Sequence, residues 1–132
     1  MFRMIGQYEI SRDGDVIRVR SASEFNLEAA QQYAKDMMQM IAAMPPRFAT
    51  LVAFEAAPII GPDVEEAMRR SAFQRAERGM VAVAFATDDA DAIEIVRGQW
   101  ERIYEGSGVA FEIFQNEDEA RAWLQRCVDR AR

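Results

Sequence analysis

The chain has 132 residues, half of them hydrophobic, with a formal net charge of -6, no histidine and one cysteine. This length suits a single domain over residues 1–132, and the acidic balance argues against binding to nucleic acid. Most metal sites and acid–base triads use histidine or cysteine, and Cys127 alone does not supply either. We therefore expect no catalytic, cofactor-binding or metal-ligating residues, and a protein that is not an enzyme.

The chain carries no sign of export or of membrane insertion. It has no run of about twenty apolar residues, and residues 1–10 lack the apolar core of a signal peptide. One cysteine cannot form an internal disulfide, which fits a reducing compartment. The sequence predicts a cytoplasmic protein without a transmembrane segment.

The chain opens with two short segments of alternating apolar and polar residues. Tyr8 and Ile10 alternate with polar neighbours, as do Ile17 and Val19. Between them lies Asp13-Gly14, a strong signal for a two-residue hairpin turn. We predict an antiparallel hairpin with one apolar and one polar face.

A helix and a buried strand follow the hairpin. Asn26 can cap a helix over residues 27–44, in which apolar residues recur at helical spacing, and the prolines at 45–46 end it. Residues 50–54 form a continuous apolar run, which is typical of a central parallel strand. Residues 55–61 are predicted to form a loop.

The rest of the chain alternates helices with strands. The predicted elements are a helix over 62–78, a strand over 80–86, a helix over 89–105, a strand over 109–113 and a helix ending near residue 129. Gly79 and the glycines at 106 and 108 indicate turns, and Asn116 with Glu119 resembles a capping box. The last three strands are predicted to be parallel, joined by right-handed crossovers.

This order of elements resembles the STAS domain family, and more narrowly its small stand-alone SpoIIAA-like members. The resemblance rests on the hairpin over 8–20, the strand over 48–54 and the ending over 114–124, which contains Glu-Ala-x-x-Trp-Leu. It implies an α/β superhelix of strand-helix turns, with a five-stranded mixed sheet, an antiparallel N-terminal hairpin and four helices. The family's helices lie mainly against one face of the sheet.

The regulatory branch of this family carries an Asp-Ser-Ser-Gly-like motif where the second helix begins, and a partner kinase phosphorylates its serine. The corresponding residues here are Ile60-Gly61-Pro62-Asp63-Val64, and no hydroxyl side chain occurs over residues 55–70. We therefore expect no phosphorylation switch. Asp63 is expected to complement the dipole of the helix in its first turn.

The second helix and its preceding loop form the candidate interaction surface. At about 100° per residue, Phe73 points roughly 130° from the centre of the apolar stripe of this helix, among charged neighbours. An exposed apolar patch commonly marks an interface, whereas burial under a neighbouring segment is the alternative. The residues assigned to this surface are Ile59, Ile60, Asp63, Arg69, Arg70 and Phe73.

Two functions remain open. The first is a non-catalytic STAS-like binding module that associates with a protein partner, or with itself, through this surface. The alternative is a carrier or sensor of a nonpolar small molecule or lipid, with peripheral membrane contact. Clustered methionines over residues 37–44 could line the wall of its binding site, although core filling is the simpler interpretation.

Two other candidate features are predicted to have no chemical role. Cys127 is predicted to be inert, and the acidic residues over 88–91 are predicted to begin a helix.

Overall fold

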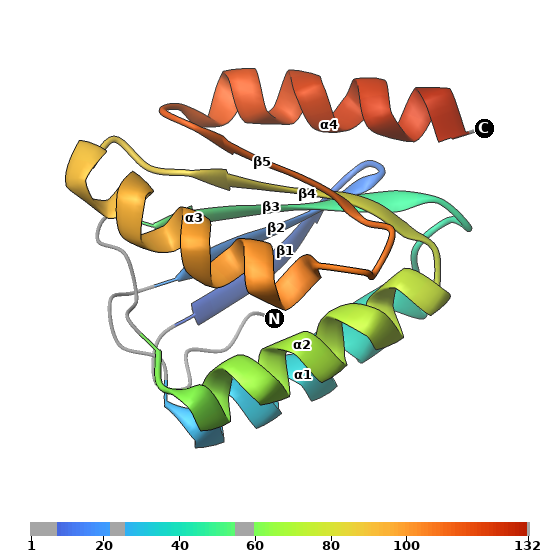
Figure 1. Ribbon diagram of the computed structural model, residues 1–132. Helices are drawn as coiled ribbons and strands as arrows, with labels where there is room; N and C mark the ends of the chain where they lie inside the picture. The colour runs from blue at the N-terminus through green and yellow to red at the C-terminus, as the bar shows by residue number, and fades with distance from the viewer. Residues whose placement is uncertain (1–7, 22–25, 55–59, 132) are drawn as a thin grey trace.

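The computed structural model describes residues 8–21, 26–54 and 60–131. These residues form an α/β fold of five strands and four helices, which confirms the predicted class (Figure 1). In chain order the elements are β1 (Tyr8–Asp13), β2 (Val16–Ser21), α1 (Leu27–Ile41), β3 (Phe48–Phe54), α2 (Pro62–Glu77), β4 (Met80–Ala86), α3 (Ala90–Tyr104), β5 (Ala110–Phe114) and α4 (Glu117–Ala131).

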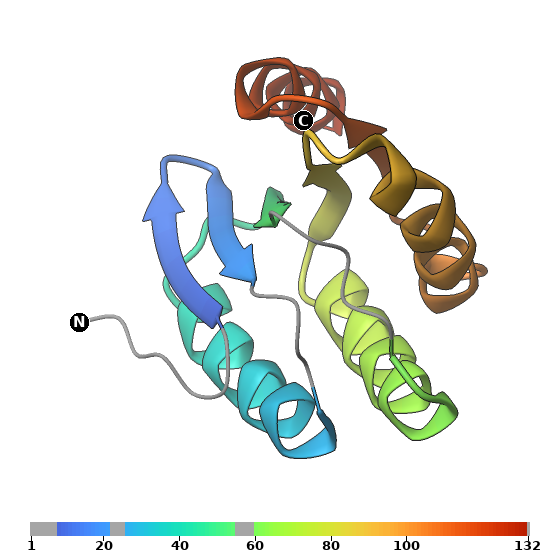
Figure 2. The same cartoon turned by 90° about the vertical axis from the view of Figure 1, so that its left-hand side faces the viewer.

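The five strands lie side by side in the order of the sequence. β1 and β2 form the antiparallel hairpin, and each later strand is parallel to the one before it. Crossovers of one hand that always step in the same direction place their helices on the same face of a sheet. Accordingly α1, α2 and α3 cover one face, and α4 packs on the other face against β3 and β4 (Figures 1 and 2).

The helix α4 extends to Ala131 rather than ending near 129, and two other boundaries also differ from prediction by more than a residue. α1 ends at Ile41 rather than near 44, because the backbone then tightens into turns closed by Ala43 N–H to Met40 O and Met44 N–H to Ile41 O. β3 begins at Phe48, since its N–H already donates to the carbonyl oxygen of Gly79 at 3.2 Å. The alternation of strands and helices is as predicted.

The sheet separates two hydrophobic cores. The larger lies beneath α1, α2 and α3 and contains most of the aromatic side chains. The smaller lies beneath α4, where Leu124 and Val128 pack against alanines of β3 and β4. Cys127 is half-buried beside this smaller core. Ion pairs from Arg18 to Glu117 and from Arg121 to Asp13, at 2.8 and 3.0 Å, join the hairpin to α4.

Candidate functional site

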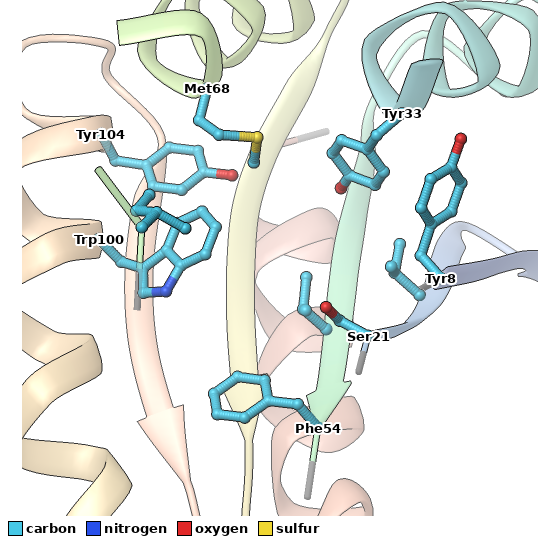
Figure 3. A pocket seen from close by; sticks show the side chains of 10 residues that line it. Tyr8, Ser21, Tyr33, Phe54, Met68, Trp100 and Tyr104 are labelled. Atoms are coloured by element: carbon cyan, nitrogen blue, oxygen red, sulfur yellow. The ribbon is translucent and has the colours of Figure 1, made fainter. Parts of the chain in front are cut away.

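A pocket lies in the larger core at the carboxyl ends of β2 and β3 (Figure 3). Ser21 and Phe54 are the last residues of these strands and form part of its wall. Ligands of open α/β sheets commonly bind beyond this end of the strands. Nine of the ten lining side chains are aromatic or aliphatic, and Ser21 is the tenth; the nine are Tyr8, Val19, Tyr33, Val52, Phe54, Ile60, Met68, Trp100 and Tyr104.

Each helix on this face contributes to the wall. Trp100 and Tyr104 are one turn apart on α3, so their rings project to the same side, with centroids 6.3 Å apart. Phe85 from β4 supports the Trp100 ring, with the two ring centroids 4.6 Å apart. Tyr33 extends from α1 and Met68 from α2, on the opposite sides of the pocket seen in Figure 3.

The pocket is small in this conformation. The empty space around the lining side chains is about 460 Å³ when the part open to solvent at the mouth is included. The cavity volume available to the centre of a water molecule is only about 20 Å³. One water molecule needs roughly 10–15 Å³ by that measure. The hollow therefore admits about one water, and a larger ligand has to displace side chains of the wall.

A buried arginine lies behind the two inner tyrosines. Arg75 follows Met68 by two turns of α2 and is only 1 % exposed. Its Nη1 donates to the hydroxyl oxygen of Tyr33 and its Nη2 to that of Tyr104, each at 3.2 Å. The guanidinium carbon also lies 5.5 and 6.0 Å from the centroids of the same two rings. Arg75 thus joins α1, α2 and α3 beneath the pocket.

The charge of Arg75 has no counter-ion among the described residues, because none of their acidic side chains pairs with it. Burial by itself lowers the pKa of Arg75, but Tyr104 and Tyr33 outweigh that effect and the net shift is upward. Burial raises the pKa of Tyr104 to about 12, so this tyrosine is neutral at pH 7 and does not balance the charge. A net positive charge remains in the core.

Hydrogen-bond donors without acceptors lie in the wall and behind it. Within the described parts of the chain, Arg75 Nε and Trp100 Nε1 are buried and have no hydrogen-bond partner. Tyr104 accepts from Arg75, which leaves its own hydroxyl proton to donate, and no acceptor for that proton is present among these residues. Tyr8 differs, since its hydroxyl turns away from the pocket and donates to Asp36 at 2.6 Å (Figure 3).

The residues predicted as an interaction surface fall into separate places. Phe73 is half-buried, not exposed: Arg69 lies over its ring, 4.9 Å from the centroid, and the turn at Gly106 lies against its edge. Arg69 in turn donates to the carbonyl oxygen of Arg102 at 2.6 Å. These two residues therefore join α2 to the end of α3.

The other members of that set are divided between the pocket and the solvent. Ile60 lines the pocket, and its N–H donates to Gln99 Oε1 at 3.1 Å. Asp63 is exposed at the start of α2, and Arg70 is exposed and pairs with Glu66 at 3.6 Å. Ile59 lies outside the described residues.

Sequence reasoning did not identify Arg75, Trp100 and Tyr104 as site residues. Arg75 follows Ala72 by three residues and Met68 by seven. That spacing places it on the stripe that the structure buries. This spacing was the signal in the sequence that Arg75 is buried. It does not indicate that Arg75 pairs with two tyrosines on other helices.

Comparison of the chain with protein-family models, with curated proteins and with solved structures gives no match. Within the described ranges, no helix combines the length and the apolar character needed to cross a bilayer. The resemblance to STAS domains stays a hypothesis.

Proposed function

We propose that this protein binds a small, largely apolar molecule in the pocket between the sheet and helices α1, α2 and α3. The observation that carries the proposal is the lining itself, with nine apolar or aromatic side chains at the carboxyl ends of parallel strands. Small-molecule sites are typically apolar hollows with a few placed polar groups. Here Ser21, the hydroxyl of Tyr104 and the indole N–H of Trp100 are such groups.

The proposed role is the alternative raised from the sequence, and the structural observations favour it over association through α2. Association needs exposed apolar surface, but Phe73 is half-buried against Arg69 and a turn. Ile60 lines the pocket rather than the outer surface of the helix. We retain the STAS-like assignment and a non-catalytic role as parts of this proposal.

Opening of the pocket is compatible with the residues of its wall. Met68 is unbranched and can change rotamer with little cost, and Ile60 is only half-buried. The packed rings of Phe85, Trp100 and Tyr104 form and support a firmer part of the wall. We infer that a ligand enters by displacing the side chains of Met68 and Ile60, while Trp100 and Tyr104 on α3 keep their positions.

Trp100 provides a reporter for binding. In a Trp123→Phe background, Trp100 is the sole tryptophan, and its emission is expected to change saturably with 1-octanol, a neutral apolar probe. Ser21→Leu should weaken this binding at least about fivefold by filling the wall, whereas Arg20→Leu, on the exposed side of the same strand, should not. Non-saturable emission changes, or equal effects of the two substitutions, would contradict the proposal. Native mass spectrometry of the purified protein tests independently for a retained small molecule.

A further inference from the structure

Around the pocket, hydrogen-bond donors are left without acceptors among the described residues. Arg75 Nε–H, Trp100 Nε1–H and the hydroxyl proton of Tyr104 are donors without acceptors among the described residues. A buried donor without a partner costs about 1–3 kcal/mol, and more when it belongs to a charged group. Several such donors around one apolar hollow indicate that a bound molecule brings the acceptors.

The unpaired positive charge of Arg75 limits the chemical classes to which that ligand can belong. Arg75 carries one positive charge, and the ten lining residues include no acidic or basic side chain. A buried charge is normally paired, because its desolvation is costly. Water can satisfy a donor, but it cannot balance this charge, whereas a single negative charge on a ligand can.

Arg75 is a positioning residue in this arrangement. It does not line the pocket, and its two donated hydrogen bonds fix the hydroxyl oxygens of Tyr33 and Tyr104, which do line it. Because the Tyr104 oxygen accepts a hydrogen bond from Arg75, its hydroxyl proton remains to be donated to a ligand. The nearby guanidinium then strengthens a hydrogen bond from that hydroxyl to an anion.

We propose that the ligand is a monoanionic amphiphile, with an apolar body and a carboxylate that accepts a hydrogen bond from Tyr104 beside the buried charge of Arg75. This inference rests on the proposed function and assigns the chemical class of its ligand. A carboxylate matches the one available positive charge. A phosphate monoester, with up to two negative charges, would leave one of them unbalanced in a desolvated site.

The test compares octanoate, 1-octanol and octyl phosphate, which share the same alkyl chain. Binding is followed by Trp100 emission in the Trp123→Phe background and checked by calorimetry. Octanoate should bind at least about tenfold more tightly than 1-octanol, since hydrogen bonds to charged groups carry that much selectivity. In Arg75→Met and in Tyr104→Phe, the affinities for octanoate and 1-octanol should differ by no more than about twofold. The preference for octanoate should persist in the control Arg70→Met, which removes an exposed arginine of the same helix.

Each other outcome has a definite meaning. Equal binding of octanoate and 1-octanol overturns the anionic ligand and leaves the proposed function standing. Absence of binding by all three probes overturns both. Tighter binding of octyl phosphate than of octanoate overturns the single-charge assignment, and a preference that survives Arg75→Met overturns the role of the arginine. If Arg75→Met does not fold, Tyr104→Phe decides alone, because it keeps the ring and removes only the hydroxyl.

Discussion

At the scale of single residues, Arg75 stands apart from the rest of the larger core. Arginine is almost never fully buried unless it is paired, yet this one is 1 % exposed, and its acceptors among the described residues are the hydroxyl oxygens of Tyr33 and Tyr104. The faces of two tyrosine rings offset part of the desolvation cost. A methionine of similar length would fill the space without that cost, so stability alone does not account for a charge at this position.

Tyr104 gives the protein a specific sensitivity to alkaline pH. Its pKa is raised to about 12 in the folded protein, against about 10 for an ordinary tyrosine. Between these two pH values the unfolded chain has released the Tyr104 proton and the folded chain still holds it. The contribution of Tyr104 to stability is therefore fully present below pH 10 and is lost as the pH rises towards 12. The expected slope is about 1.4 kcal/mol per pH unit.

Urea denaturation of the wild type and Tyr104→Phe across pH 9 to 12 measures this effect. The variant should lack that part of the slope, because phenylalanine does not ionise. All other ionisable groups are common to the two proteins, so the difference between the two curves isolates Tyr104. Parallel curves would show that its folded-state pKa is not raised.

Phe73 tests the remaining hypothesis of association through α2. Because its ring is half-buried against Arg69 and the turn at Gly106, Phe73→Ser should cost about 1–2 kcal/mol of unfolding free energy, between the effects of surface and core substitutions. Sedimentation of the variant and the wild type then reports self-association. A loss below 0.5 kcal/mol together with weaker association would favour the interaction surface predicted from the sequence.

At the scale of elements, the sequence predicted what depends on local pattern. The apolar run of β4 and the glycine and proline punctuation around α2 each act within a few residues, so both elements were found almost to their ends. The pocket depends on side chains from three helices and three strands. Arg75 meets Tyr33 and Tyr104 across 42 and 29 residues of chain, and no periodicity encodes such a meeting. The role of the arginine was therefore missed.

The joint between α2 and β4 shows how closely two elements can approach. Gly79 has φ +111°, and a Cβ atom there would lie 1.9 Å from the carbonyl oxygen of Pro46, which precedes β3. Gly108 also has a positive φ, +83°, but nothing lies within 4 Å of an added Cβ. Gly108→Ala should therefore cost about 1–2 kcal/mol from backbone strain alone. Gly79→Ala should cost at least about 2 kcal/mol more, because backbone has to move.

Chemical denaturation of these two alanine variants separates strain from crowding. Equal losses would mean that the Pro46 segment yields easily and that the close approach does not constrain the fold. A larger loss in Gly79→Ala would establish that the α2–β4 turn and the segment before β3 are fixed against each other.

At the scale of the whole molecule, the sheet divides two different kinds of core. The face beneath α1, α2 and α3 contains the pocket, the buried charge and most of the aromatic rings. The face beneath α4 is aliphatic and alanine-rich, and ion pairs from α4 to the hairpin lie at its border. Donors without partners occur on the first face, which suggests that binding depends on that face while α4 contributes mainly to stability.

Val128→Ala examines this division. The side chain is fully buried beneath α4 on the face opposite the pocket, and removing two methyl groups there should lower the free energy of unfolding by about 2 kcal/mol. The affinity for octanoate, measured by Trp100 emission well below the melting temperature, should change less than about twofold. A sheet that is close-packed on both sides could transmit the disturbance instead. A fall in affinity in proportion to the lost stability would then show that the two cores act as one unit.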